Sequence, residues 1–276
     1  MHGRVRRLTG YAAGVLLLAF PLAACSVKED RAPCPCYLVL DMDGMAHNPD
    51  YPQGLVTIMS GQVISQERIT LSDHEGTGYE KAVPRRLVDA SCAAGHEDLW
   101  WHTDTLYAAT GLEWGPVMLA CAQVDCNDDL RHVRMDFRKE HCRVTFMLVG
   151  VTDADSYPFD LRVRANSCGV RMRDRRPVDG RYTVYARRGN TAFFHTTLPR
   201  QSESEIALDL LMHSDTHEYT PDDLVVTLDM GRMLRDQGYD WTRDDLEDVY
   251  VTVDVVKATA TISIQPWDRS EVREEI

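Results

Sequence analysis

Alternating apolar and polar residues dominate this chain and predict β-strands. In the stretch 142–150 the apolar residues Val144, Phe146 and Leu148 fall on one face, with arginine and threonine on the other. Residues 248–255 repeat the pattern with valine at every odd position. From Ala258 to Ile264 the apolar residues occupy even positions instead, so we expect a turn or bulge near Lys257. A period of two over this length is typical of half-buried strands.

Many further strand-like runs follow one another, separated by turn-forming residues, whereas helical patterns are short. Such a series of short strands predicts an all-β protein of antiparallel sandwiches. A charged cluster at residues 138–141 ends one set of strands, and a fresh alternating strand follows it. We therefore predict two sandwich domains at 34–139 and 140–269, with a tail at 270–276.

The N-terminus has the pattern of an export signal. The first ten residues carry three arginines and no acid, and residues 11–24 are mostly apolar. That apolar run is too short to span a bilayer of about 30 Å comfortably. The residues that close it resemble the bacterial lipoprotein box, namely Leu22, Ala23, Ala24 and Cys25. A plain secretory signal with a chance cysteine is the alternative.

In that box, the cysteine sulfur takes a diacylglyceryl thioether before cleavage leaves Cys25 as the first residue. The signal peptide is then 1–24, and residues 25–33 form a polar leash. Two or more acyl chains give stable anchoring, so lipidated Cys25 predicts an outer-membrane protein held by palmitate-type lipid. The lysine and acids after Cys25 resemble a surface-export signal of Bacteroidetes lipoproteins, which predicts the cell surface.

The charge balance excludes one class of partner. Removing residues 1–24 takes away three arginines and no acid, so 27 of the 30 basic residues and all 43 acidic residues remain, a formal charge of −16. Nucleic acid and anionic lipid headgroups are poor partners for such a chain.

Of the eight cysteines, seven remain once Cys25 carries lipid, so at least one is unpaired or pairs between molecules. An exported chain can form disulfides. Cys121 and Cys126 are candidates to close a short loop between neighbouring strands, whereas Cys34 and Cys36 are too close for an easy bridge to each other. The fourfold constellation of a structural zinc site is missing, so we expect no metal.

An Asp-x-Asp-Gly segment follows the first predicted strand, as in phosphatases of the haloacid-dehalogenase type. Asp41 would then be the nucleophile of a magnesium-dependent phosphatase and Asp43 its acid/base. However, Met45 stands where that family usually has threonine, and the fold needs strands alternating with helices of about ten or more residues. The downstream sequence lacks such helices, so the preferred interpretation is the acidic end of a sandwich strand.

Other catalytic patterns are weak. His213 and His217 are four residues apart, but the residues between them follow a strand and indicate a loop. The sequence contains neither a nucleophile elbow nor a phosphate-binding glycine loop. We therefore expect a protein that is not an enzyme and needs no cofactor.

Two adjacent tryptophans, Trp100 and Trp101, are candidates for a partner contact. Neighbouring residues on a strand face opposite sides, so one ring is expected in the core and the other at an edge or the surface. There it is suited to a protein partner or a sugar. Core packing of both rings is the alternative, and the sequence favours it at least as much.

The two ends of the mature chain resemble a known family. The lipidated cysteine, the acidic leash and residues 30–43, DRAPCPCYLVLDMD, look like the opening of the Bacteroidetes fimbrial anchor family, the fimbrillin-associated outer-membrane lipoproteins of the FimB type. Residues 239–267 resemble the family's last strands, which close with a tryptophan.

The resemblance implies two tandem transthyretin-like β-sandwiches that tether a fimbrial shaft to the outer membrane and limit its length. Fimbrial shaft subunits would be the partners, bound at a sheet edge. The candidate contact strands are 37–43 and 258–265. A surface lipoprotein that captures glycan or host protein through Trp100 and Trp101 is the alternative.

Overall fold

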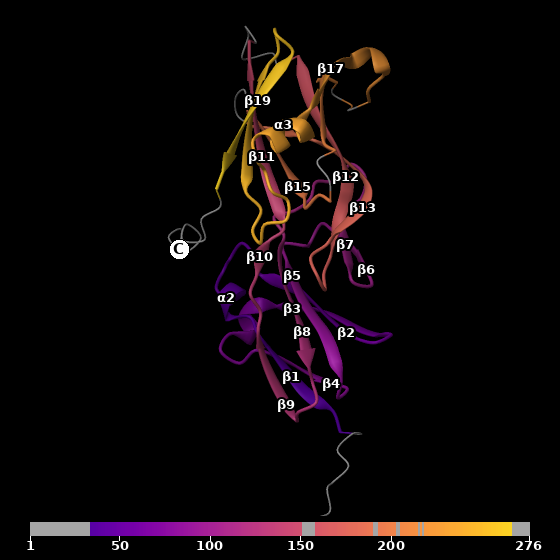
Figure 1. Cartoon of the computed structure of the whole chain (residues 1–276), viewed down its shortest axis with the longest axis vertical. Helices are drawn as coiled ribbons and strands as arrows, with labels where there is room; N and C mark the ends of the chain where they lie inside the picture. Colours follow the sequence, from indigo (N-terminus) through magenta and orange to yellow (C-terminus); the bar gives the residue numbers. More distant parts are fainter. Residues whose placement is uncertain are drawn as a thin grey trace, which may run out of the picture.

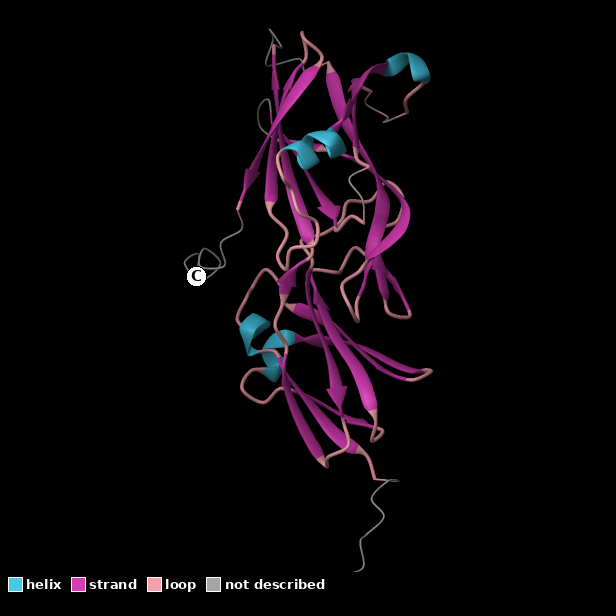
Figure 2. Cartoon of the chain, in the orientation of Figure 1, coloured by secondary structure: helices cyan, strands magenta, loops and turns pink. Residues whose placement is uncertain are grey.

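The computed structural model describes residues 34–150, 158–189, 193–202, 205–214, 216 and 218–266. Figure 1 shows an elongated molecule in which one pair of sheets is stacked on another, and the described chain enters at the lower end. The described helices are short and lie beside the sheets (Figure 2). The all-β prediction is therefore confirmed.

The lower sandwich consists of a three-stranded and a five-stranded sheet. The first contains, in order across the sheet, β4 (Tyr79–Val83), β1 (Cys36–Asp41) and β9 (Leu130–Arg134). The second contains β10 (Arg138–Lys139), β8 (Met118–Asp125), β5 (Leu87–Ala94), β2 (Gln53–Ser60) and β3 (Val63–Thr70). Helix α2 (Asp43–Ala46) packs against the 3-10 helix η1 (Leu71–His74).

The two lower sheets share one hydrophobic core. Leu38 and Leu40 of β1 are fully buried, whereas the preceding Tyr37 is about half exposed. Val56 and Ile58 of β2 contribute from the facing sheet. Leu38 and Leu40 thus share one face of β1 and point into this core, as strand alternation predicts.

The upper sandwich consists of a five-stranded and a six-stranded sheet. The first contains β14 (Arg187–Arg188), β15 (Phe193–Pro199), β11 (His141–Val149), β18 (Asp248–Asp254) and β19 (Thr259–Gln265). The second contains β17 (Leu224–Asp229), β16 (Ala207–Met212), β12 (Phe159–Arg171), β7 (Thr105–Tyr107) and β6 (Trp100–His102), with β13 (Pro177–Tyr185) on the opposite edge of β12. Two short helices accompany them, η2 (Pro221–Asp223) and α3 (Met230–Asp236).

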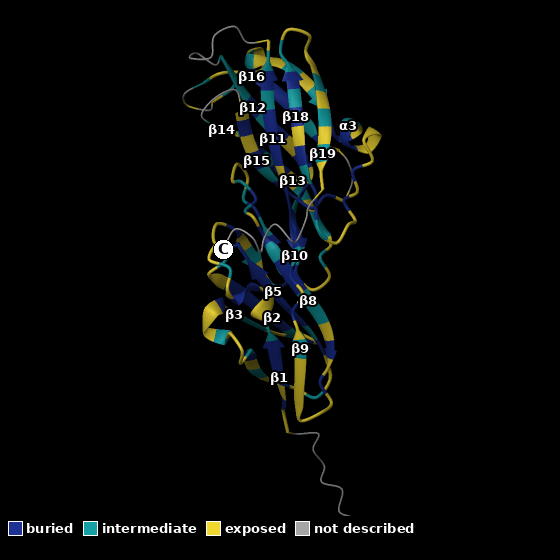
Figure 3. Cartoon of the chain, turned by 90° about the vertical axis from the view of Figure 1, so that its left-hand side faces the viewer, coloured by how far each residue is buried: buried dark blue, intermediate teal, exposed yellow. Residues whose placement is uncertain are grey.

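The period-two strands occur where the sequence predicts them. Val144, Phe146 and Leu148 of β11 are buried, as are the odd-numbered valines of β18 (Figure 3). The change of parity near Lys257 is a turn at residues 255–258, in which Ala258 has a φ of 52°. The turn pairs odd residues of β18 with even residues of β19, so both apolar sets face the same core.

The sheets differ from simple sandwiches in two ways. β1 pairs with β9 in parallel and β11 with β18 in parallel, while the other pairs are antiparallel. In addition, β6 and β7 lie within the predicted first-domain range 34–139, yet they pair with β12 of the upper sandwich. Local sequence patterns do not contain this information, because it depends on which distant strand offers a free edge.

Buried charges fill the joint between the sandwiches, where β10 leads into β11. The Lys139 ammonium group is almost fully buried and donates hydrogen bonds to the Leu246 carbonyl at 2.9 Å and to Asp248 Oδ1 at 2.5 Å. The fully buried Glu140 carboxylate pairs with Arg175 and Arg200. Since each charged group has a partner, the joint is tightly specified.

Candidate functional site

Exposed sheet edges are the parts of this fold that can accept a further strand, because their outer N–H and C=O groups lack a strand partner. The outer strands of five or more residues in the described chain are β3, β4, β9, β13, β17 and β19. Charged side chains usually protect such edges from unwanted pairing. Among these described edge strands β19, with the sequence TATISIQ, alone contains no charged residue, and it also has no proline.

Among the described residues β19 has a strand partner on one side only. It pairs with β18 along its whole length, from Thr259 to Gln265. Its residues Ala260, Ile262 and Ile264 are half-buried and pack on the upper core, while the residues between them are exposed. Helix α3 packs beside β19 without pairing with it (Figure 3). The strand is thus held in place by its apolar face, and no described strand pairs with its outer edge.

The other candidate contact strand, 37–43, has no open edge. β1 lies between β4 and β9, and both neighbours pair with it. β1 is the first strand in the sequence but not an edge strand, because β9, more than 90 residues later in the chain, pairs with its second side. Of the two candidate contact strands only 258–265 remains.

The tryptophan pair lies on the hairpin β6–β7, and the two rings face opposite sides as strand alternation predicts. Trp101 packs against the upper core, and the Arg68 guanidinium carbon lies 4.3 Å from its ring centroid. Trp100 is 58% exposed and meets Tyr107 edge-on, with ring centroids 6.2 Å apart. The hairpin therefore presents one aromatic side chain to solvent.

The hairpin also bridges the two sandwiches. On one side, Gln66 Nε2 of β3 donates a hydrogen bond to the Thr103 carbonyl at 2.5 Å. On the other side, the Met172 N–H donates to the Asp104 carbonyl at 2.6 Å, directly after the pairing of β7 with β12. The hairpin that carries the exposed Trp100 ring is therefore hydrogen-bonded to both sandwiches. The sequence pattern did not predict that the hairpin connects the sandwiches, because Gln66 and Met172 are far from it in the chain.

The Asp41–Asp43 segment serves the backbone of a turn. Asp41 Oδ1 accepts a hydrogen bond from the Asp43 N–H at 3.0 Å, and Asp43 Oδ1 accepts one from the Gly76 N–H at 2.8 Å. The longest helix among the described residues has seven residues, whereas the phosphatase fold needs helices of about ten or more between its strands. The two carboxylates therefore have a structural role here, and the phosphatase fold is not present around them.

Three further predictions from the sequence concern metal binding, the histidine pair and the lipoprotein box. Within the described residues no group of three or more His, Cys, Asp or Glu side chains is arranged to hold a metal ion. His213 Nδ1 lies 2.9 Å from Asp160 Oδ2, while His217 falls outside the described residues. The lipoprotein box, including Cys25, also lies outside them. No helix in the described part is long and apolar enough to cross a membrane.

The fold defines a class, the all-β proteins of two stacked sandwiches, and solved bacterial surface proteins share it. No protein-family model matches the sequence, and no curated protein matches it significantly. In structure, the chain is similar to the fimbrial anchor protein Mfa2 from Porphyromonas gingivalis, with a TM-score of 0.51 and 15% identity over 85% of this chain and 98% of that one.

Two structures from Bacteroides thetaiotaomicron are similar as well. One is a proposed adhesin, with a TM-score of 0.54 and 10% identity over 86% of this chain and 98% of that one. The other is a proposed polysaccharide-binding protein, with a TM-score of 0.57 and 11% identity over 85% of this chain and 96% of that one. At these identities the likeness concerns the fold. The chain has a fimbrial-anchor-like fold, as the family resemblance implies.

Proposed function

We propose that this chain is a cell-surface lipoprotein that anchors a fimbrial shaft by accepting a strand of a shaft subunit along β19. The observation that carries the proposal is the uncharged outer edge of β19, which lies in the sandwich away from the end where the described chain begins (Figure 1). The similarity in fold to a fimbrial anchor protein supports it. Neither cofactor nor catalysis is required for this role.

The two ends of the molecule have different tasks in this proposal. Lipid on Cys25 holds the chain to the outer membrane, and the leash leads into the first strand of the lower sandwich. The shaft subunit adds its strand to the upper sandwich, so the paired charges of the joint connect membrane and shaft. A strand seven residues long offers a row of main-chain hydrogen bonds, which give affinity, and its neighbouring side chains give specificity.

The membrane half of the proposal is tested by metabolic labelling. Labelled palmitate is expected in the wild-type protein and not in Cys25→Ala, because the thioether requires the cysteine sulfur. Equal labelling of the two proteins would remove the lipid anchor from the proposal.

The shaft half is tested by co-purification from membrane extracts. Thr261→Lys with Ser263→Lys places two charges on exposed positions of β19, and edge lysines oppose strand addition. We expect the variant to lose most of the co-purifying fimbrial subunit. His132→Lys, an exposed position on the edge strand β9, is the matched control and should retain it. Equal recovery with both variants would contradict strand addition at β19.

A second candidate function rests on the exposed Trp100. An exposed aromatic ring on a rigid hairpin suits a sugar or a host protein, and one protein of similar fold is described as a proposed polysaccharide-binding protein. Glycan-array binding that is lost in Trp100→Ala and kept in Tyr250→Ala would favour this function. Tyr250 is 46% exposed on β18 and serves as an aromatic control away from the hairpin.

A further inference from the structure

Two cysteines far apart in sequence meet in the core of the lower sandwich. Cys36 is the first residue of β1, and Cys126 follows the last residue of β8. Both side chains are 0% exposed and belong to the same hydrophobic cluster, although 90 residues separate them. The topology therefore brings together the strand that follows the leash and the strand that faces it from the other sheet.

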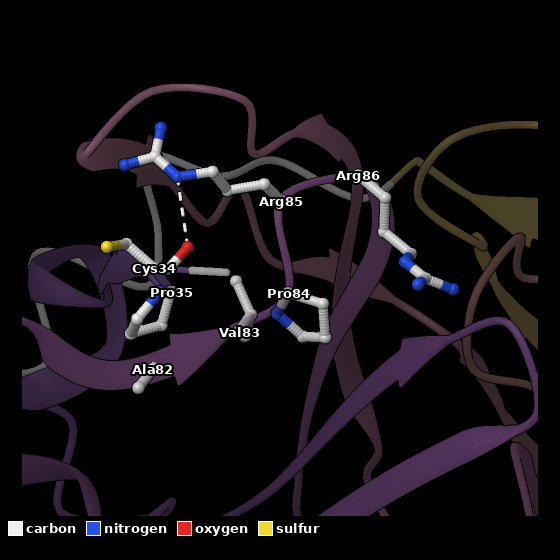
Figure 4. Close-up of a pocket in the computed structure, with 7 residues that line it drawn as sticks. All are labelled: Cys34, Pro35, Ala82, Val83, Pro84, Arg85 and Arg86. Carbon is white, nitrogen blue, oxygen red and sulfur yellow. Dashed lines mark hydrogen bonds between the residues drawn. The ribbon is translucent and has the colours of Figure 1, made fainter. Parts of the chain in front are cut away.

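The backbone around the two cysteines is held together on both sides. The Tyr37 N–H donates a hydrogen bond to the Asp129 carbonyl at 2.9 Å. Arg85 donates from Nε to the Cys34 carbonyl at 3.0 Å and from Nη1 to the Asn127 carbonyl at 2.5 Å, and Figure 4 shows the first of these bonds. One guanidinium group thus links Cys34, two residues before Cys36, to Asn127, the residue after Cys126.

The two thiols are direct neighbours. The pKa of the Cys126 thiol is raised to about 11, first by burial and then by the Cys36 side chain, which acts on it through charge and a hydrogen bond. Cys92, which is equally buried in the same cluster, has its pKa raised to about 12 by burial alone. The contribution of Cys36 to the pKa of Cys126 therefore comes from a neighbouring thiol and not from burial alone.

We propose that Cys36 and Cys126 form a disulfide bond that closes the lower sandwich directly after the leash. The bond forms when the two thiols lose two protons and two electrons to a disulfide-bearing protein oxidant of the export compartment, whose own disulfide is reduced to two thiols. Because both sulfur atoms are buried in the folded chain, oxidation takes place before the core closes.

The alternative partner for Cys126 suggested by the sequence is wrong. Cys121 lies within β8 and Cys126 directly after it, so the two occupy one extended strand and not two neighbouring strands. Five residues at about 3.3 Å each separate their Cα atoms by roughly 16 Å, whereas a disulfide requires less than about 7 Å.

The bond also determines how the molecule bears load, a consequence that rests on the proposed function. Tension from the lipid enters at the leash and reaches Cys36. With the disulfide the covalent path runs directly from Cys36 to Cys126 and on to the upper sandwich, so residues 37–125 lie outside the covalent load path. In single-molecule stretching, reduction should therefore lengthen the fully extended chain by roughly 320 Å, which is 90 residues at about 3.6 Å each.

Peptide mapping of the wild-type protein from the bacterial envelope tests the bond without any variant. After alkylation in denaturant without reduction, digestion with trypsin and the protease Asp-N releases residues 32–40 and 125–127 as separate peptides. We expect them as one linked species, 2 Da lighter than the sum of the two peptides, that separates on reduction. Alkylated Cys36 and Cys126 in this sample would overturn the proposal.

Two matched variants assign the sulfur atom. Residues 32–40 contain both Cys34 and Cys36, so Cys34→Ser should retain the linked species and Cys36→Ser should lose it. A link that survives in Cys36→Ser would overturn the assignment. Since the map does not depend on shaft binding, a missing disulfide and a missing fimbrial partner are distinguishable results.

Discussion

Replacing Glu140 with alanine removes the carboxylate on which two arginines converge in the joint between the sandwiches. Glu140 Oε2 accepts a hydrogen bond from Arg200 Nε at 2.7 Å, and Oε1 accepts from Arg200 Nη2 at 3.2 Å and from Arg175 Nε. Glu140 is fully buried, and the Arg200 side chain is only 6% exposed. Glu140→Ala therefore leaves the Arg200 charge in a site that bulk water reaches poorly.

The cost follows from the charge left behind. Arg200 keeps its hydrogen bonds to the carbonyls of Trp241 and Arg243, but these neutral groups carry no opposite charge. Removing one partner of a buried ion pair typically destabilises a protein by about 3–5 kcal/mol. Replacing Glu140 and Arg200 together by methionine should recover part of this loss, because no unpaired buried charge remains between them.

Urea unfolding followed by tryptophan fluorescence measures the effect. Trp114 reports on the joint directly, since its Nε1–H donates to the Glu140 carbonyl at 3.0 Å. With a slope of about 2 kcal/mol per molar urea, the midpoint should fall by about 2 M. Asp236→Ala is the control, because its exposed pair with Arg232 spans 3.9 Å and should contribute at most about 0.5 kcal/mol. A Glu140→Ala midpoint within about 0.5 M of wild type would refute the argument.

Three further predictions concern other buried and exposed positions. Burial lowers the pKa of His141 to about 3, so the unfolded chain binds a proton near pH 6.5 that the folded chain does not. Stability should fall by about 2 kcal/mol between pH 7.5 and 5, and His141→Asn should remove this pH dependence in urea titrations at the two pH values. Gly169→Ala should cost about 1–3 kcal/mol in thermal unfolding, because its Cβ would meet the Leu106 carbonyl, and an unchanged melting temperature would contradict this. Trp100→Ala should lower the free energy of unfolding by less than about 1 kcal/mol and Trp101→Ala by about 3 kcal/mol. Equal effects would contradict the assignment of Trp101 to the core and Trp100 to the surface.

Sequence reasoning predicted the parts of the fold that depend on neighbouring residues. Alternation placed β11, β18 and β19 and the turn at residues 255–258, because side chains on a strand alternate between two faces wherever one face is buried. The same rule separated Trp100 from Trp101. The sequence also indicated 258–265, which contains β19, as one of two candidate contact strands, but it did not distinguish this strand from 37–43.

Errors arose where a conclusion depended on residues far apart in the chain. The hairpin β6–β7 belongs to the upper sandwich although its sequence lies in the range predicted for the lower one. β1 has two strand neighbours, so it offers no edge. Cys121 lies in β8 and Cys126 directly after it, while Cys126 meets Cys36 of β1 in the facing sheet. No spacing rule along the chain predicts these contacts.

By itself the sequence determined the all-β class, the faces of the main strands and the acidic charge, and it predicts a lipoprotein-type N-terminus. These follow from local periodicity, composition and a short motif, which need no knowledge of distant residues. Only the tertiary structure decided which edges are open, which cysteines are neighbours and how the charged residues 138–141 become a buried joint. Strand order sets these features, and it is fixed by the packing of both cores together because each strand pairs with whichever neighbour buries its apolar face.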